Sequence, residues 1–249
     1  MTSETSKEKR PETSDSLFGG RLMVCQEEKG YRFSLDAVLL AGLTRVRKDD
    51  RVVDLGTGSG IIPLVLAYRA KTGRKIAGIE IQPELAELSK KNVEKNNFVG
   101  LIDIYQMDFR EVSKTFEPGS FDLALSNPPY RKPGAGLISP NRQKAIARHE
   151  LTANIDDVLG AMGYLLGEGG RAAFVYPSTR MGNLLRSALD NGFSPKRLTI
   201  VYSYPGGPGR LVHLECRKGG GEELKIEKPF YIYETNGSYS DAMQKLYNE

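Results

Sequence analysis

Residues 51 to 60, Arg-Val-Val-Asp-Leu-Gly-Thr-Gly-Ser-Gly, join an apolar run to a glycine-rich turn. The β-branched run predicts a short buried strand, and the apolar residues 61 to 70 after the turn predict a buried helix. Pro63 is compatible with this helix because the first helical turn needs no N–H from it. The stretch therefore predicts a strand, turn and helix unit, the building block of an α/β fold.

The rest of the chain repeats this alternation. Further strands are predicted at residues 75 to 79, 101 to 107, 121 to 125 and 172 to 176, and helices at 35 to 41, 83 to 96, 155 to 166 and 181 to 191. Segments 196 to 203 and 210 to 217 flank a Pro-Gly loop and should pair antiparallel. An extended segment at 224 to 233 and a helical tail near 240 to 248 follow. The prediction is a doubly wound, Rossmann-like α/β fold with a mostly parallel sheet and an antiparallel C-terminal hairpin.

Composition favours one globular domain. We predict a disordered tail over residues 1 to 16, which hold no apolar side chain after Met1, and a single domain over residues 17 to 249. There is no run of 18 apolar residues and no secretory signal, so we expect no membrane partner and a cytoplasmic location. The two cysteines and two histidines are isolated in the sequence, which argues against a metal site. A monomer and a dimer are both compatible with the sequence.

Positive charge is concentrated in two stretches. The formal net charge is +4, and residues 127 to 150 alone hold five basic side chains against one acidic side chain. Residues 194 to 218 hold the same excess. Such stretches are most often solvated surface, but beside a candidate pocket they suggest contacts with phosphate groups.

Four polar side chains end successive predicted strands: Asp54, Glu80, Asp108 and Asn127. The carboxyl ends of parallel strands share one edge of a sheet, where ligands bind near the switch point of the strand order. Glu80 is placed to accept hydrogen bonds from two ribose hydroxyls, and Asp108 with Phe109 to bind and stack an adenine. These strand ends predict one ligand site along the edge.

The glycine-rich turn suggests the chemistry of the rest of the ligand. Gly56, Gly58 and Gly60 allow a sharp turn and a close approach of the ligand to the backbone. NAD is one alternative, but the dinucleotide pattern needs a glycine where Ile61 stands, and no Walker lysine follows. Asp54 would repel a pyrophosphate and attract an ammonium. The turn therefore favours a ligand with an amino-acid moiety.

Residues 126 to 130, Ser-Asn-Pro-Pro-Tyr, follow the strand predicted at 121 to 125. Proline fixes its own φ and holds the residue before it extended, so Asn127 and Pro128 can direct their oxygens into one small space beside Tyr130. Taken alone, the two prolines are compatible with an ordinary turn. The acidic strand ends before them and the basic stretch after them favour a functional role.

With these motifs the sequence resembles the class I S-adenosylmethionine (AdoMet) methyltransferases, and Asn127-Pro128-Pro129-Tyr130 is similar to their catalytic motif for planar amino groups. The resemblance implies AdoMet as the cofactor. The Asn127 side-chain oxygen and the Pro128 carbonyl would accept both N–H bonds of the amine, and Tyr130 would stack on the base. The cofactor-binding residues expected on this basis are Phe33, Ser34, Asp36, Asp54, Gly56, Thr57, Gly58, Gly60, Glu80, Ile81, Asp108, Phe109 and Asn127.

Three further motifs are similar to those of the bacterial tRNA1(Val) adenine-N6 methyltransferases, which modify the adenine 3′ of the anticodon. They are residues 31 to 41 (Tyr-Arg-Phe-Ser-Leu-Asp-Ala-Val-Leu-Leu-Ala), 147 to 150 (Ala-Arg-His-Glu) and 210 to 213 (Arg-Leu-Val-His). The resemblance covers roughly residues 17 to 240, and Arg131 stands where the family frequently has an aromatic residue. It implies tRNA as the partner. The RNA-binding residues expected are Arg131, Lys132, Arg142, Lys144, Arg148, His149 and Arg210.

Two alternative functions remain at the level of sequence. A glutamine-N5 methyltransferase of release factors uses the same four-residue motif, but such enzymes carry a separate helical domain before the core, and the basic stretch favours RNA. A non-catalytic RNA-binding module on the same fold is distinguished by AdoMet binding, which the intact glycine-rich turn predicts. A structural ion-paired turn is the simplest alternative role for Arg148-His149-Glu150.

Overall fold

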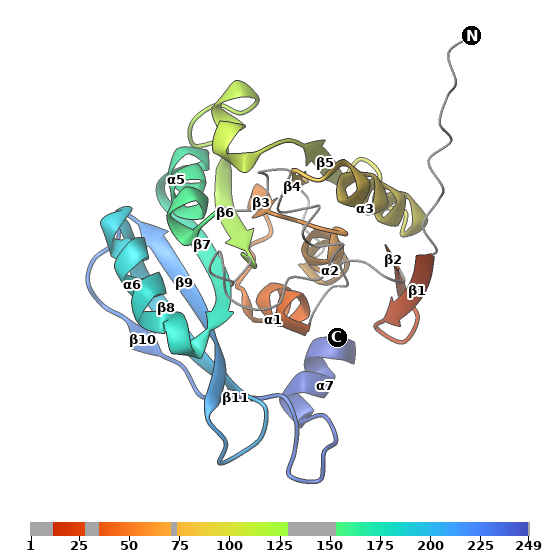
Figure 1. The fold of residues 1–249 in the computed structure, drawn as a ribbon, viewed down its shortest axis with the longest axis vertical. Helices are drawn as coiled ribbons and strands as arrows, with labels where there is room; N and C mark the ends of the chain where they lie inside the picture. The colour runs from red at the N-terminus through yellow and green to blue at the C-terminus, as the bar shows by residue number, and fades with distance from the viewer. Residues whose placement is uncertain (1–11, 28–34, 71–73, 129–152, 249) are drawn as a thin grey trace, which may run out of the picture.

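The computed structural model describes residues 12–27, 35–70, 74–128 and 153–248. An N-terminal hairpin precedes an alternation of strands and helices (Figure 1). The elements are β1 (Glu12–Leu17), β2 (Leu22–Glu27), α1 (Leu35–Leu43), β3 (Val52–Leu55), α2 (Ile61–Ala70), β4 (Ile76–Glu80), α3 (Pro83–Lys95), β5 (Ile102–Gln106), η1 (Phe109–Lys114), β6 (Phe121–Ser126), α5 (Ile155–Leu165), β7 (Leu166–Pro177), η2 (Ser178–Arg180), α6 (Met181–Asp190), β8 (Phe193–Tyr202), β9 (Gly209–Lys218), β10 (Lys225–Ile226), β11 (Phe230–Tyr231) and α7 (Asp241–Asn248).

One nine-stranded sheet forms the centre of the described chain, in the order β10-β8-β9-β7-β6-β3-β4-β5, with β11 also paired to β8. The pairs from β5 to β7 are parallel, whereas β9 runs antiparallel to both β7 and β8. Strand order reverses between β3 and β6, so a crevice at their carboxyl ends is where a doubly wound fold binds its ligand. The predicted parallel sheet with an antiparallel C-terminal hairpin is confirmed.

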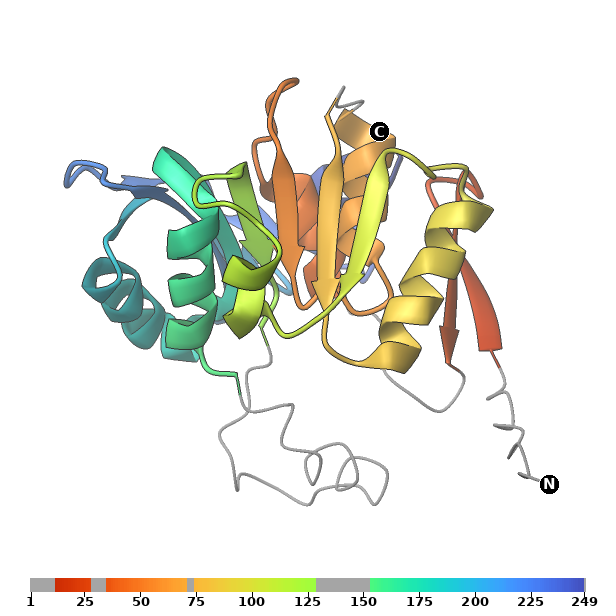
Figure 2. The ribbon, with the colours of Figure 1, turned by 90° about the horizontal axis from the view of Figure 1, so that it is seen from above.

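Alternation along the strands builds a core on each face of the sheet. Val52 of β3 packs with α1, α2 and α7, whereas Val53 packs with α5 and α6. The same switch occurs on β7, where Ala173 belongs to the first core and Phe174 to the second. Figure 2 shows α5 and α6, in green and teal, lying together beside one half of the sheet. Buried on both faces, these strands are apolar throughout, as a central parallel sheet requires.

The predicted helices and strands match the structure to within a few residues, with two differences. β7 begins at Leu166 directly after α5, whereas we expected its start at Ala172. The glycines at 167, 169 and 170 therefore lie inside β7 rather than before it. They carry an irregularity in its pairing with β6, between Phe121 and Leu123. Glycine inside a strand commonly accompanies such a bulge.

The second difference concerns the start of the ordered chain. Residues 12 to 16 were expected in a disordered tail, and this boundary is wrong because they form β1, paired antiparallel with β2. The side chains of 13 to 16 are exposed or half-buried, so β1 carries no apolar pattern of its own. Its partner supplies the anchor, since Leu22 and Val24 are fully buried. Residues 1 to 11 lie outside the described residues.

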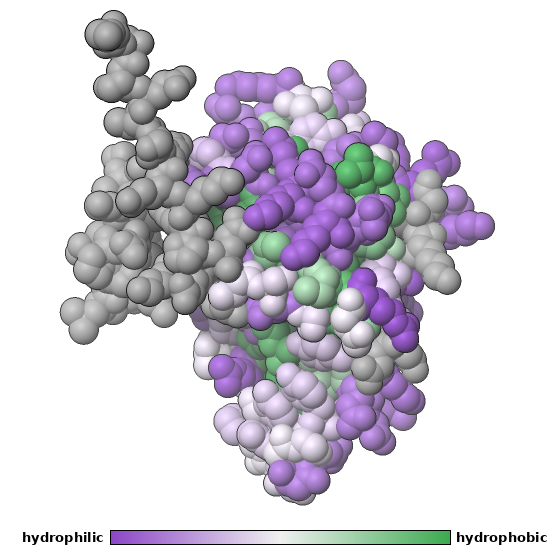
Figure 3. Space-filling model, turned by 90° about the vertical axis from the view of Figure 1, so that its right-hand side faces the viewer, coloured by the Kyte–Doolittle hydropathy of each residue, from purple (hydrophilic) through white to green (hydrophobic). Residues whose placement is uncertain are grey.

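The surface on the side of α3 and the hairpin is largely hydrophilic, with small separated apolar areas (Figure 3). This agrees with α3, which buries Leu85 and Leu88 and exposes Glu87 and Lys91. Among the described helices, none has the length and apolar character needed to cross a membrane.

Candidate cofactor and substrate site

The carboxyl ends of β6, β3 and β4 bring three of the predicted residues together. Asp54 pairs in register with Leu125 on one side and Gly78 on the other, so Glu80 and Asn127 each lie two residues further along the adjacent strands. Neighbouring strands are ~5 Å apart, which places all three side chains along one short edge. The sequence-based expectation of a shared edge is therefore met for Asp54, Glu80 and Asn127.

The glycine-rich turn is held by backbone contacts to β4. The N–H groups of Gly56 and Thr57 both donate to the Ile79 carbonyl, at 2.9 and 3.0 Å. Gly56, Gly58 and Gly60 have φ of +77°, +58° and +82°, a region in which other residues are strained. A Cβ on Gly56 would meet no atom within 4 Å, whereas one on Gly60 would lie 2.3 Å from Ser89 Oγ. Gly60 is thus needed for packing, and Gly56 faces open space.

Asp54 is fully buried, and neither of its carboxylate oxygens has a hydrogen-bond partner among the described residues. Burial raises the pKa of Asp54 to about 7. The Thr57 hydroxyl lies near enough to favour the charged form, although it falls short of hydrogen-bond geometry, and the Glu80 carboxylate opposes that form. An unpaired buried carboxylate costs several kcal/mol, by order of magnitude. The side chain is therefore suited to a cationic ligand group such as the ammonium of AdoMet.

Glu80 is positioned by the backbone on both sides. Its Oε2 accepts the Gly58 N–H at 2.8 Å, and its Oε1 accepts the Gln82 N–H at 2.9 Å. Burial raises the pKa of Glu80, while the nearby backbone N–H groups of Gln82, Gly58 and Ile81 oppose that shift. A carboxylate oxygen has two lone pairs, so each oxygen keeps one acceptor site. Glu80 can still accept two hydroxyl hydrogens, as a ribose would offer.

Asp108 and Phe109 lie just beyond β5, at the same edge. Asp108 caps η1 by accepting the Arg110 N–H at 2.9 Å, and its carboxylate also pairs with the Arg110 guanidinium. Partial burial favours a higher pKa for Asp108, but the hydrogen bonds from Arg110 outweigh it and lower the pKa. Phe109 is half-buried against the core beneath α5. Asp108, one of the two residues predicted to contact an adenine, is thus already paired with Arg110.

The catalytic motif is only partly described. Ser126 Oγ donates to the Leu55 carbonyl at 2.9 Å, which ties the end of β6 to the start of the glycine-rich turn. Asn127 is half-buried and Pro128 is buried. Asp36 lies in the first turn of α1. The other predicted residues of this region, Phe33, Ser34, Pro129, Tyr130, Arg131, Lys132, Arg142, Lys144, Arg148 and His149, lie outside the described residues.

The second basic stretch, residues 194 to 218, from which we expected phosphate contacts, does not form one surface. The pairing of Pro177 with Leu211 places Arg210 at the carboxyl edge, whereas Arg217 pairs with Arg171 near the opposite edge. Arg197 is held in ion pairs with Glu215 and Glu227, at 2.6 and 2.7 Å. A stretch that crosses a sheet as a hairpin necessarily divides its charges between the two edges. Only Arg210 remains on the ligand side.

Two features of the site carried no sequence signal. Asn92 is a buried polar residue of α3 whose side chain donates to the Ser59 carbonyl in the glycine-rich turn at 3.0 Å. A pocket also lies beyond β7, between η2 and the loop that joins β8 to β9. Its lining combines residues 178 and 179 with residues 203, 204 and 207 to 210, which only the sheet topology brings together. Among the described residues, no group of three His, Cys, Asp or Glu side chains is arranged to hold a metal ion.

Comparisons with known proteins find similarity to methyltransferases. A family model for the methyltransferase small domain matches residues 32–154. Curated proteins named tRNA1(Val) (adenine(37)-N6)-methyltransferase are similar over most of their length. The protein of Shewanella sediminis is 29% identical, over 87% of this chain and 91% of its own. That of Parabacteroides distasonis is 29% identical, over 91% of this chain and 96% of its own.

Solved structures share the fold at lower identity. A predicted O-methyltransferase from Agrobacterium tumefaciens superposes with a TM-score of 0.70 at 20% identity, covering 86% of this chain and 95% of that chain. A Pyrococcus horikoshii TYW2 structure in complex with MeSAdo gives a TM-score of 0.58 at 17% identity, covering 84% and 72%.

Proposed function

Because the chain belongs to the AdoMet-dependent methyltransferases that carry the methyltransferase small domain, we propose that it transfers a methyl group to the exocyclic N6 of an adenine in tRNA. The relatives' names support the adenine 3′ of the anticodon of tRNA1(Val) as the finer substrate. The observation that carries the proposal is the buried, unpartnered Asp54 at the head of a glycine-rich turn, beside Glu80 and Asn127.

The residues of the edge fit AdoMet. Asp54 offers two free acceptors to the ammonium, the open space at Gly56 admits the ligand next to the backbone, and Glu80 retains acceptors for the ribose hydroxyls. When bound, AdoMet supplies an electrophilic methyl group on a sulfonium. NAD fits less well, because its pyrophosphate would face the Asp54 carboxylate.

The chain's own contribution to the reaction is orientation. An exocyclic amine is a weak nucleophile because its lone pair is delocalised into the ring. If the Asn127 side-chain oxygen and the Pro128 carbonyl accept its two N–H bonds, the lone pair is turned out of the ring plane toward the methyl group. AdoMet would supply the methyl group and be left as a neutral thioether, and the methylated nitrogen would release one proton to solvent. Positioning and fixed dipoles of this kind supply much of the rate in such sites.

Tyr130, outside the described residues, is proposed to stack on the base, and the basic residues from Arg131 to His149 to hold the RNA. Loop bases are already partly unstacked, so moving one into the site costs little. We further propose a single domain that works where tRNA is found, in the cytoplasm.

Nucleoside mass spectrometry on valine tRNA from cells that lack the protein tests this function. We expect N6-methyladenosine to disappear, and to return with the wild-type gene but not with Asn127→Ala. Asn236→Ala, which changes an exposed asparagine in a turn, serves as the matched control and should restore the modification. An unchanged nucleoside profile, together with loss of methylglutamine from a release factor, would favour the protein-directed alternative.

A further inference from the structure

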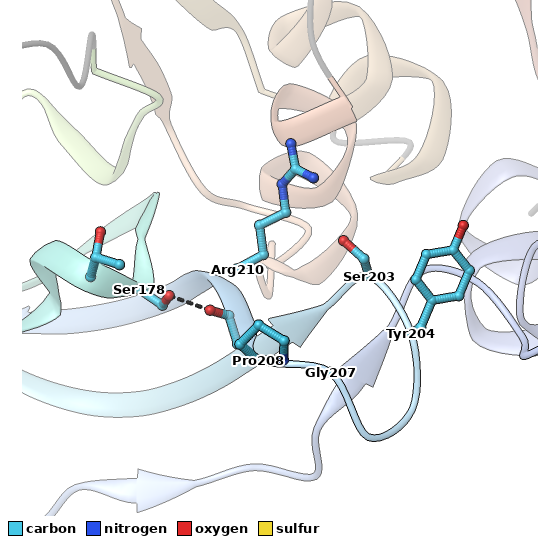
Figure 4. A pocket seen from close by; sticks show the side chains of 8 residues that line it. Ser178, Ser203, Tyr204, Gly207, Pro208 and Arg210 are labelled. Atoms are coloured by element: carbon cyan, nitrogen blue, oxygen red, sulfur yellow. Dashed lines mark hydrogen bonds between the residues drawn. The ribbon is translucent and has the colours of Figure 1, made fainter.

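A pocket of about 460 Å³ lies at the carboxyl edge of the sheet, outside the predicted cofactor site. In Figure 4, Arg210 extends between Ser178 on one side and Ser203 with Tyr204 on the other. The pocket is lined by Ser178, Thr179, Ser203, Tyr204, Gly207, Pro208, Gly209 and Arg210. It therefore combines one cation, three aliphatic hydroxyl groups, one phenol ring and no acidic side chain.

The polar groups of the pocket are suited to an anion. Arg210 is exposed and has no hydrogen-bond or ion-pair partner among the described residues. By contrast, Lys218 of the same hairpin is already bound to the protein, because it donates to the carbonyls of Gly163 and Leu166 at 2.6 and 2.8 Å. Ser178 is also engaged, donating to the Gly209 carbonyl and so fixing the rim of the pocket (Figure 4). A guanidinium beside free hydroxyls is a typical binding group for phosphate.

The aromatic wall of the pocket is the end of a column of four tyrosines. Tyr204 stacks on Tyr233 with ring centroids 5.2 Å apart, Tyr233 on Tyr239 at 5.3 Å, and Tyr239 on Tyr247 at 5.5 Å. The column joins the end of β8 to α7 and holds the Tyr204 ring in place. Even so, Tyr204 is 44% exposed. A fixed and exposed ring is a platform on which a nucleobase can stack.

The location relates the pocket to the methylated base. β6 and β9 both flank β7, so Asn127 and Arg210 are separated by two strand spacings across the sheet, ~10 Å, and by three residues along the strands, another ~10 Å. Both lie at the carboxyl edge of the sheet: Asn127 directly follows β6, and Arg210 is near the start of β9. The register shows this, since Ser126 pairs with Phe174 and Leu211 with Pro177 at the end of β7. This separation suits a nucleotide close to the target adenine rather than the target itself.

We propose that this pocket is a subsite for a nucleotide neighbouring the target adenine, with Arg210, Ser203 and Thr179 holding its phosphate and Tyr204 stacking on its base. The inference rests on the proposed function, because it assumes an RNA substrate. It assigns recognition of the RNA to the β8–β9 loop as well as to the catalytic motif.

Fluorescence anisotropy with a labelled anticodon stem-loop, measured at several salt concentrations, tests the subsite. Arg217→Ala is the matched control, because Arg217 is an exposed arginine on the same strand, seven residues and ~24 Å away at the opposite edge. We expect Arg210→Ala to bind the RNA about tenfold more weakly. Its plot of log affinity against log salt concentration should be less steep, by the amount that corresponds to about one phosphate contact. Arg217→Ala should match the wild type.

Tyr204→Ala should also weaken binding about tenfold, with an unchanged salt slope, and Tyr204→Phe should keep most of the affinity. All variants should bind AdoMet as the wild type does, which shows that the fold is intact. If the wild type methylates tRNA and Arg210→Ala binds RNA like Arg217→Ala, the subsite is wrong while the proposed function stands. If the wild type neither binds nor methylates RNA, both are wrong.

Discussion

The side chain of Asn92 binds the backbone of Cys25 at both of its polar groups. Its Oδ1 accepts the Cys25 N–H at 2.7 Å, and its Nδ2 donates to the Cys25 carbonyl at 3.0 Å. One helical turn later, Asn96 binds Met23 in the same way, at 2.8 and 2.7 Å. The two asparagines thus pair with the outer edge of β2 as a strand would. Asn92 alone also reaches the glycine-rich turn, through Ser59.

Asn92→Ala should therefore weaken AdoMet binding more than Asn96→Ala does. Both variants leave a backbone N–H of β2 without its partner, so each should lose about 1–3 kcal/mol in the free energy of unfolding. Only Asn92→Ala also frees the Ser59 carbonyl beside the cofactor site. Denaturant unfolding and calorimetric titration with AdoMet measure the two effects. Equal losses of AdoMet affinity in both variants would rule out the coupling through Ser59.

The raised pKa of Asp54 leads us to expect that AdoMet affinity depends on pH. Because burial raises the pKa of this carboxyl to about 7, it is half protonated near neutrality in the free protein. A cationic ligand group binds the ionised form, so affinity should rise as the pH increases through 7 and then level off. Binding at pH 6.5 should release a proton. Titrations in two buffers with different ionisation enthalpies detect that release, and identical heats in both would contradict it.

The same carboxyl should cost stability in the absence of AdoMet. The folded-state pKa lies above the ordinary value of 3.8. Below pH 3.8 the carboxyl is protonated in both the folded and the unfolded state and costs no stability. As the pH rises through 7, the unfolded state ionises first and the folded state loses stability relative to it. A difference of about three pH units corresponds to about 4 kcal/mol. Asp54→Asn should thus become increasingly more stable than the wild type up to pH 8, while binding AdoMet far more weakly. Denaturant unfolding at pH 4 and pH 8 measures this, and a pH-independent difference would contradict it.

Gly56 offers a test of the open space in the turn. Gly56→Ala and Gly192→Ala change glycines with the same φ of +77°, and neither new Cβ would meet an atom within 4 Å. Both should lose about 1–2 kcal/mol in unfolding free energy from the left-handed backbone. Only Gly56→Ala should also lose AdoMet affinity, by at least tenfold, because its methyl group would occupy space assigned to the ligand. Equal AdoMet affinities in the two variants would contradict that assignment.

His213 should make the protein sensitive to acid. It is buried, and burial, together with Arg197, lowers its pKa to about 3. The Thr44 hydroxyl donates to the Leu40 carbonyl, so it accepts its second hydrogen bond, of 3.1 Å, from Nε2 of a neutral His213. The stability of this arrangement is present above pH 6.5 and is lost as the pH falls toward 3.

His213→Gln keeps an N–H donor for Thr44 and removes the titrating ring. Relative to the wild type, its unfolding free energy should improve by about 3 kcal/mol between pH 7.5 and pH 4.5. Denaturant unfolding at these two pH values provides the comparison, and a constant difference would show that His213 is not the group responsible.

Much of this architecture follows from local sequence pattern. The apolar runs before Asp54, Glu80 and Asn127 predicted three strands of one sheet, and the residues that end them predicted the site. Pattern could not reveal β1, because its side chains are mostly polar and its order depends on β2. Nor could it show that β9 carries Arg210 and Arg217 to opposite edges, since charge counted along a chain ignores the direction of a strand. Asn92 was missed for a similar reason, because its partners lie 33 and 67 residues away.

The central claim is methyl transfer to adenine N6 in tRNA, and one assay with purified protein tests it directly. The protein is incubated with AdoMet and a tRNA1(Val) transcript, which is then digested and examined by nucleoside mass spectrometry. A second transcript carries inosine in place of the adenine 3′ of the anticodon and so lacks the exocyclic amine. We predict one N6-methyladenosine per transcript in the first sample and no methylated nucleoside in the second. Equal methylation of both transcripts, or of neither, would contradict the assignment.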